Sequence, residues 1–286
     1  MRYPLKTVST RTWEQAVSWL REQPGSLELV RACYYDDPLA EASERYYKSE
    51  EWKEVSRLLS HNIPCRVLDI GAGRGISSYA FAKDCCRVTA LEPDKSHLVG
   101  ISAIKELIKS SGLPIRAVQG HGEALPFKDR SFDLVYGRAV LHHAQDLERL
   151  SIEASRVLIP GGVFLATREH VVSRLSDLDL FLSSHPLHAL YGGENAFLLD
   201  QYKRAISAAG LKLQKVIGPY DSVINYAPMS LREHRENIAS LFKRFIGQRL
   251  SKALAVNILA ASLMSRYLSF RCNTPGRLYS FLAVKL

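Results

Sequence analysis

From residue 66 onward, short apolar runs alternate with segments of helical periodicity. The apolar runs predict strands over 66–70, 87–92, 115–119, 132–136, 162–168, 211–217 and 278–284. The segments between them predict helices over 75–83, 94–110, 146–158 and 199–209. This alternation is typical of a parallel sheet with helices on both faces. We therefore predict an α/β, Rossmann-like, doubly wound and mostly parallel seven-stranded sheet.

Two regions interrupt this alternation. The first, residues 1–60, predicts short helices over 13–22 with Thr12 as cap, 27–33 with Ser26 as cap, 39–48 and 50–59. The second separates the last two strands and predicts helices over 230–246 and 248–270. The predicted organisation is a helical segment over 1–60, a core over 61–221, a helical insertion over 222–274 and a final strand over 275–286.

Charge is concentrated in the insertion. The chain carries a formal net charge of +9, and residues 222–276 hold eight Lys and Arg against Glu233 and Glu236. A basic surface can attract an anionic substrate or a membrane, and no aromatic-interleaved basic stripe indicates a nucleic-acid partner. The uncharged stretch 253–265 is too short to span a bilayer, and residues 1–20 show no signal pattern. Five cysteines without metal-type spacing indicate reduced thiols, so we expect a cytoplasmic protein in which peripheral membrane contact stays open.

The first predicted strand ends in an acid, Asp69, and is followed by glycines at 71, 73 and 75. Glycines directly after a buried strand permit a tight turn and let a ligand approach the backbone. A dinucleotide fingerprint requires a small residue at position 76, where this chain has Ile76. The second strand ends in Glu92, whose carboxylate can accept hydrogen bonds from both ribose hydroxyls. These features predict a site for a nucleotide-like cofactor.

Four sequence blocks, 67–75, 88–94, 119–135 and 157–164, together resemble the class I S-adenosylmethionine (SAM) methyltransferases of the ubiquinone-biosynthesis-like type. The resemblance implies SAM as cofactor, S-adenosylhomocysteine as its product, and an N-terminal helical lid. The basic insertion over 222–274 would lie beside the mouth of the active site in this family, and we assign it to substrate capping or assembly. His121 stands where many members of this family have an aspartate that binds the adenine amine. The cofactor contacts that the resemblance implies are Asp69, Gly71, Ala72, Gly73, Gly75, Glu92, Pro93, His121, Gly122, Glu123 and Arg138.

The methyl acceptor is expected beyond the carboxyl ends of the fourth and fifth strands, since open α/β sheets bind ligands there. His143 or His170 is the predicted general base, with Glu169 and Arg138 as further catalytic candidates. The segment 185–195 lies outside the resembling blocks and is predicted to set specificity. The predicted acceptor contacts are Tyr34, Tyr35, His142, Arg168, His185, His188, Tyr191 and Glu194.

Methyl transfer from SAM to a small molecule, such as a saccharide or natural product, is the predicted function, with oxygen favoured over nitrogen or carbon. One alternative is a lipid or quinone-like acceptor at a membrane surface. Another is a divalent metal that assists the reaction, with ligands from His143, His170, His188 and Glu194, since imidazole and carboxylate bind such ions. The third alternative is a non-catalytic SAM-binding scaffold protein. The sequence leaves open whether the protein is a monomer or a homodimer.

Overall fold

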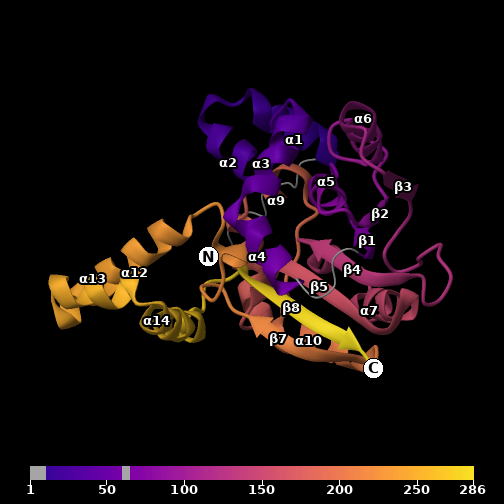
Figure 1. The fold of residues 1–286 in the computed structure, drawn as a ribbon. Helices are drawn as coiled ribbons and strands as arrows, with labels where there is room; N and C mark the ends of the chain where they lie inside the picture. The colour runs from indigo at the N-terminus through magenta and orange to yellow at the C-terminus, as the bar shows by residue number, and fades with distance from the viewer. Residues whose placement is uncertain (1–10, 60–64) are drawn as a thin grey trace.

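The computed structural model describes residues 11–59 and 65–286, and its centre is one mixed sheet (Figure 1). The sheet order is β3-β2-β1-β4-β5-β8-β7, with the two-residue β6 paired to the end of β5. Every pairing is parallel except those of β8 with β5 and with β7. The strands are β1 (Arg66–Ile70), β2 (Arg87–Glu92), β3 (Ile115–Gln119), β4 (Phe132–Arg138), β5 (Leu158–Val172), β6 (Phe197–Leu198), β7 (Leu211–Ile217) and β8 (Arg277–Lys285).

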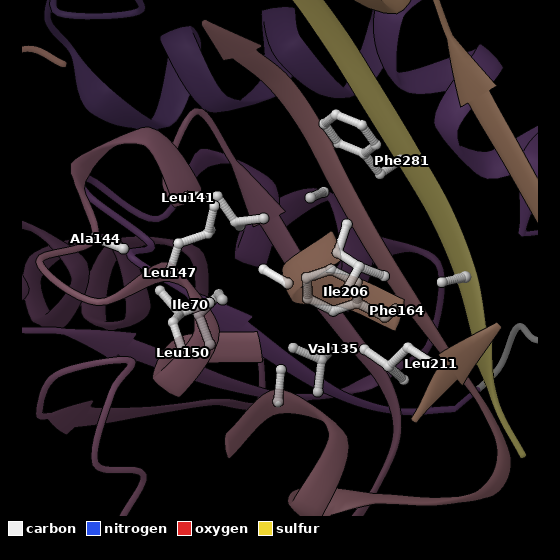
Figure 2. Packing of buried hydrophobic residues seen from close by; sticks show 14 of the residues in the cluster. Ile70, Val135, Leu141, Ala144, Leu147, Leu150, Phe164, Ile206, Leu211 and Phe281 are labelled. Carbon is white, nitrogen blue, oxygen red and sulfur yellow. The ribbon is translucent and has the colours of Figure 1, made fainter. Parts of the chain in front are cut away.

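Side chains of the central strands alternate between two cores, because successive residues of a strand point to opposite faces. Leu68, Val135 and Phe164 pack on one face with α7 (Leu147–Val157) and α10 (Leu199–Ala208), as Figure 2 shows for this cluster. Val67, Leu134 and Leu165 pack on the other face with α4 (Glu50–Leu58), α5 (Ile76–Lys83) and α6 (Ile101–Ser111). The doubly wound α/β architecture predicted from the sequence is therefore confirmed.

The predicted strands are all present, with four differences, the smallest being β8, which covers 277–285 where 278–284 was predicted. β4 runs two residues further, to Arg138, and β5 is a 15-residue strand rather than a seven-residue one. The extension of β5 carries residues 169–172 past β4, where they pair with β8 and β6. β6 was not predicted, since two residues give no readable periodicity.

Most predicted helices of the N-terminal segment are confirmed. Thr12 forms a capping box with Gln15 at the start of α1 (Trp13–Glu22), followed by α2 (Leu27–Ala32) and α3 (Leu39–Lys48). The prediction that Ser26 caps α2 was wrong, because its side chain accepts no hydrogen bond and it ends the short 3-10 helix η1 (Pro24–Ser26). Residues 1–10 and 60 of the predicted lid lie outside the described residues.

Two other helix predictions need correction. The helix predicted over 94–110 begins only at Ile101, because Asp94 accepts hydrogen bonds from the amides of Ser96 and Ile101 and so closes a turn. The insertion contains α12 (Leu231–Ile246), as predicted, but the second predicted helix is two, α13 (Gln248–Val256) and α14 (Ile258–Arg271). They are separated at Asn257, whose side chain accepts from the amide of Ala260 and starts α14.

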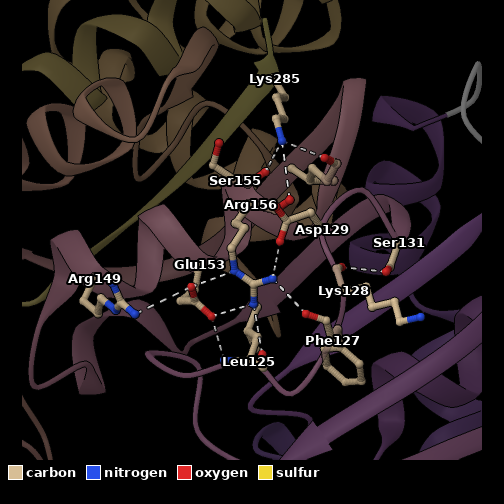
Figure 3. Close-up of polar contacts among 11 residues, drawn as sticks. Leu125, Phe127, Lys128, Asp129, Ser131, Arg149, Glu153, Ser155, Arg156 and Lys285 are labelled. Atoms are coloured by element: carbon tan, nitrogen blue, oxygen red, sulfur yellow. Dashed lines mark hydrogen bonds and ion pairs between the residues drawn. The ribbon is translucent and has the colours of Figure 1, made fainter.

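The loop between β3 and β4 is fixed to α7 by one guanidinium. Arg156 pairs with Glu153, at 2.8 Å, and with Asp129, at 2.7 Å, and donates to the carbonyls of Leu125 and Phe127 (Figure 3). Five donors in a planar fork suit one guanidinium to several acceptors. This contact holds the segment that precedes β4 against the C-terminal end of α7.

The carboxyl ends of β1, β2, β4 and β5 meet at one edge of the sheet, since these strands are parallel. The insertion leaves the sheet at this same end, because β7 runs parallel to β5 through the intervening antiparallel β8. Helices α12–α14 lie together to one side of the sheet (Figure 1). Among the described residues no single helix is long and apolar enough to cross a bilayer; α13 and α14 meet that criterion only as a pair, bent by 100°.

Candidate active site

A cavity of about 950 Å³ opens at the carboxyl ends of the strands. It runs from the glycine loop after β1 to the histidines that follow β4 and β5. Four predicted site residues do not line it, namely Asp69, Gly75, Glu169 and His188. Those that do are Tyr34, Tyr35, Gly71, Ala72, Gly73, Glu92, Pro93, His121, Gly122, Glu123, Arg138, His142, His143, Arg168, His170, His185, Tyr191 and Glu194.

The glycine loop has no room for a side chain at its first position. Gly71 has φ +57°, and a Cβ there would lie 2.7 Å from Cγ2 of Val140, in the loop after β4. The amide of Ala72 donates to the carbonyl of Leu91, at 3.0 Å, which ties the loop to β2. The chain therefore exposes bare backbone to the cavity at this point, as a closely approaching ligand requires.

Two buried carboxyl groups lie around this loop. The oxygens of Glu92 accept from the amides of Gly73, at 2.7 Å, and Asp94, at 3.0 Å. Burial raises the pKa of Glu92 to about 7. Asp69 accepts from the hydroxyl of Ser78, at 2.6 Å, and burial raises its pKa to about 7 as well. Glu92 faces the cavity, whereas Asp69 supports the loop from behind.

Arg138 is held by a partner far away in the sequence. It makes a two-pronged ion pair with Glu51 of α4, at 2.7 and 3.0 Å, and its guanidinium lies over the rings of Tyr34 and Tyr46. Glu51 is 2% exposed. A buried carboxylate needs such a counter-charge. Arg138 therefore neutralises Glu51 and, as part of the same contact, forms part of the cavity wall. Arg168 lies beside this pair, 4.0 Å from Glu51, and donates to the carbonyl of Ile224.

The histidines share one arrangement of their rings. Nδ1 of His142 lies 2.7 Å from Glu169, that of His143 lies 3.0 Å from the carbonyl of Gly193, and that of His170 lies 2.7 Å from the carbonyl of Gly276. A neutral ring whose Nδ1–H donates to an oxygen presents the lone pair of Nε2, whereas a protonated ring donates from both nitrogens. Glu169 also accepts from the amides of Val140 and His142 and is fully buried. Glu169 therefore fixes the orientation of the His142 ring.

Glu194 is the acidic centre of this group, which we call the histidine cluster: His142, His143, His170, His185 and Glu194. Its Oε2 lies 3.7 Å from Nε2 of His142 and 3.9 Å from Nε2 of His143. Its Oε1 lies 4.0 Å from Nδ1 of His185 and accepts from the hydroxyl of Tyr191 at 2.6 Å. The carboxylate is buried, but these histidines hold its pKa below the usual range.

The histidines of the cluster differ in basicity. Burial alone would lower the pKa of His142, but the carboxylates of Glu169 and Glu194 raise it to about 9. Burial and the neighbouring His142 lower the pKa of His170 to about 3. The same two causes lower the pKa of His143, whose side chain is 38% exposed. His143 is thus a neutral imidazole with access to the cavity.

Several lining residues were missed from the sequence. Trp13 of α1 stacks on Tyr191 of α9 (His188–Tyr191) with ring centroids 6.3 Å apart, so residues 178 positions apart in the chain share a wall. Arg74 follows the second glycine, donates to the carbonyls of Tyr34 and Asp36, and pairs with Asp37. Its place inside the glycine loop was the available signal. Nothing in the local pattern marked Trp13 or Cys33.

Comparisons with known proteins relate the central part of this chain to methyltransferases. Residues 68–166 match the family described as a methyltransferase domain. A sarcosine/dimethylglycine N-methyltransferase of Halorhodospira halochloris is 37% identical over 148 residues, which are 50% of each chain. An uncharacterized methyltransferase of Bacillus subtilis (strain 168) is 34% identical over 41% of this chain and 46% of its own. A sterol 24-C-methyltransferase of Gibberella zeae is 32% identical over 54% of this chain and 42% of its own. This chain thus spans about half the length of these curated relatives.

The fold is shared with solved structures at lower identity. A geranyl diphosphate methyltransferase in complex with SAM superposes with a TM-score of 0.56 at 17% identity, over 94% of this chain and 95% of its own. The [4+2]-cyclase SpnF superposes with a TM-score of 0.55 at 18% identity, over 85% of this chain and 80% of its own. A fold hosts several reactions, so these likenesses establish the architecture alone.

Proposed function

We propose that this chain, which carries a class I SAM-dependent methyltransferase domain, transfers the methyl group of SAM to an oxygen of a small-molecule acceptor. One observation carries the proposal: a single cavity joins the glycine loop and Glu92 at one end to the histidine cluster at the other. The relatives' names include N- and C-methyltransferases. Oxygen is favoured by the imidazoles of the cluster, because a hydroxyl must lose its proton as it is methylated.

The cofactor end of the cavity fits SAM. Each oxygen of Glu92 accepts one amide hydrogen and keeps a further lone pair that can accept from a ribose hydroxyl. The space above Gly71, which a Cβ could not share with Val140, leaves backbone for the amino-acid end of the cofactor. When bound, SAM supplies an already activated sulfonium methyl group. The protein's own part is to align the acceptor with that methyl and to exclude water.

His143 is the general base of this proposal. Its Nδ1–H donates to the carbonyl of Gly193, which fixes the tautomer, and its Nε2 is the atom left to take the hydroxyl proton. His170 has the same arrangement, but its pKa of about 3 makes it a much weaker proton acceptor. Arg168, Tyr191 and His185 line the cavity around the base and would orient the acceptor.

The test compares two histidine variants in an assay that works with an unidentified acceptor. Methyl-labelled SAM is incubated with fractionated metabolites, and labelled products are counted. We expect His143→Asn to lose about 100-fold or more in product formation, with SAM affinity by calorimetry unchanged. His188→Asn is the matched control, because His188 does not line the cavity, and it should retain activity. Equal losses in both variants would refute the role of His143, and SAM binding without product from any fraction would favour a scaffold.

A metal-assisted reaction is the second candidate, and the histidine cluster carries it. His142, His143 and Glu194 each offer one ligand atom, and these atoms lie within 4.8 Å of one another; His170, His185 and Glu194 form a second such group. Metal-binding imidazoles commonly donate their other N–H to a carboxylate or carbonyl, as His142 and His143 do. A divalent ion here would use His143 as a ligand rather than as a base. Elemental analysis and chelation distinguish the two: activity that survives chelation of a metal-free preparation removes this candidate.

A further inference from the structure

Helix α14 has its large apolar side chains on the wrong side for a helix of a globular core. The residues that face the protein are small: Ala261, Ser265 and Ser269 are buried, each four positions after the previous one. Those that face outward are large: Leu259, Leu263, Tyr267 and Phe270 are 78%, 67%, 55% and 83% exposed. This spacing places the four on one face of the helix. We call them the α14 stripe.

The inward face of α14 is fixed by specific contacts, so the helix is not free to turn over. The hydroxyl of Ser265 lies 2.9 Å from Nε2 of His234 in α12, and Oγ of Ser269 accepts from the amide of Tyr220 at 2.9 Å. Gly218 allows this approach, since a Cβ there would lie 2.9 Å from Cβ of Ser269. Rotating the stripe inward would break these contacts and put large rings where small residues fit.

The exposed apolar residues are concentrated in the insertion. Ten of the sixteen exposed large apolar residues in the described chain lie in α12–α14, although these helices hold a small part of the sequence. Among the insertion residues whose side chains the structure describes, none lines the cavity described above. The insertion, predicted to cap the substrate or to serve assembly, therefore presents an outward surface rather than a wall of the site. A contiguous apolar patch of this kind marks an interaction surface.

Charge decides between the possible occupants. Lys243, Arg244, Arg249, Arg266 and Arg271 are exposed around the apolar residues, and residues 222–276 hold eight cationic side chains against two carboxylates. A second copy would bring two such basic surfaces together, which costs free energy. An anionic bilayer complements both features, because its headgroups attract Lys and Arg while its acyl boundary accepts Leu, Tyr and Phe.

We propose that the α14 stripe and its flanking basic side chains dock the protein on the surface of an anionic lipid bilayer. The 14 residues of α14 extend about 21 Å, less than the roughly 30 Å of a hydrocarbon core. The 100° bend between α13 and α14 also prevents the pair from crossing as one rod. The stripe therefore lies in the interface. This inference is independent of the methyl acceptor and of the general base.

Vesicle flotation tests it with the full chain. We expect binding to vesicles of equal parts phosphatidylcholine and phosphatidylglycerol, weak binding to pure phosphatidylcholine, and release at high salt. The double variant Leu263→Glu, Phe270→Glu should lose about tenfold or more in vesicle affinity. Leu27→Glu is the matched control, because Leu27 is an exposed apolar residue on α2, away from the insertion.

The fold and the oligomeric state of the wild type and the double variant are measured on the same samples. SAM affinity and the thermal midpoint of the double variant should equal those of the wild type, which separates a lost surface from a lost fold. Size-exclusion chromatography reports oligomers. A wild type that binds no anionic vesicles overturns the proposal. The proposal is also overturned if the wild type is a dimer that binds no vesicles and the double variant is a monomer. The stripe would then be an interface between two copies of the chain.

Discussion

Gly71→Ala offers a sharp test of how the glycine loop works. Two costs are expected. Alanine at φ +57° costs about 1–2 kcal/mol in the left-handed region. Its Cβ would also lie 2.7 and 2.9 Å from the two Cγ atoms of Val140, and relieving such overpacking costs about 1–3 kcal/mol. Val140 cannot withdraw freely, because its amide donates to the buried Glu169.

The matched control separates the two costs. Gly112, after α6, has φ +66°, and a Cβ added there would meet nothing within 4 Å, so Gly112→Ala incurs only the backbone cost. We expect urea denaturation to show Gly71→Ala less stable than Gly112→Ala by about 1–3 kcal/mol. SAM affinity should fall about tenfold or more in Gly71→Ala alone, because both Gly71 and Val140 line the cavity.

A second substitution, at Val140, tests whether the contact with Val140 causes the loss. Val140→Ala removes both Cγ atoms that the new methyl would meet, so the double variant Gly71→Ala, Val140→Ala should regain most of the lost SAM affinity. The reasoning fails if Gly71→Ala binds SAM as the wild type does and is no less stable than Gly112→Ala. It also fails if the double variant binds SAM no better than the single one, since the contact with Val140 would then not be the cause.

Two further predictions concern buried charges. Because burial raises the pKa of Glu92 from 4.5 to about 7, the folded state binds its proton more tightly than the unfolded state; this stability is present below about pH 4.5 and is lost as the pH rises through about 7. Between pH 4.5 and 7 the free energy of unfolding of the wild type should fall by about 3 kcal/mol more than that of Glu92→Gln. Urea denaturation of the SAM-free protein at several pH values measures this difference. If the two proteins lose the same stability over this range, the raised pKa of Glu92 is contradicted. Glu51→Gln leaves Arg138 without its buried counter-charge and should destabilise the protein by about 3–5 kcal/mol, whereas Glu54→Gln, whose partner Arg57 is exposed, should cost about 1 kcal/mol or less.

The grouping of the residues proposed to hold the cofactor could be predicted from the sequence because these residues are local. Asp69, the three glycines and Glu92 lie at the ends of two successive strands, and parallel pairing of β1 with β2 brings them together without help from distant segments. The arrangement at the proposed acceptor end of the cavity could be predicted only in part. Residues 142–143 and 170 follow strands β4 and β5, so their proximity could be expected, but the way Glu194 joins them depends on a loop with no regular period.

Arg138 shows why distant pairing limits such predictions. Its place at the end of β4 made it a candidate for cofactor binding and catalysis, and the structure does put it in the cavity wall. Its guanidinium, however, is engaged by Glu51, 87 positions earlier. In the sequence Glu51 looks like any acid in the first turn of an exposed helix. Only the packing of α4 against the sheet buries it and makes Arg138 its counter-charge.

The segments that close the cavity at the histidine cluster come from outside the matched methyltransferase domain of residues 68–166. Leu20 and Val30 of the N-terminal helices pack with Leu187 in a small core of their own, beside the stacked pair of Trp13 and Tyr191. Tyr191 in turn donates to Glu194, the acid at the centre of the histidine cluster. The N-terminal helices and residues 185–195 thus behave as one packed unit that positions Glu194. A change of acceptor among relatives would then require both segments to change together, while the glycine loop and Glu92 could stay as they are.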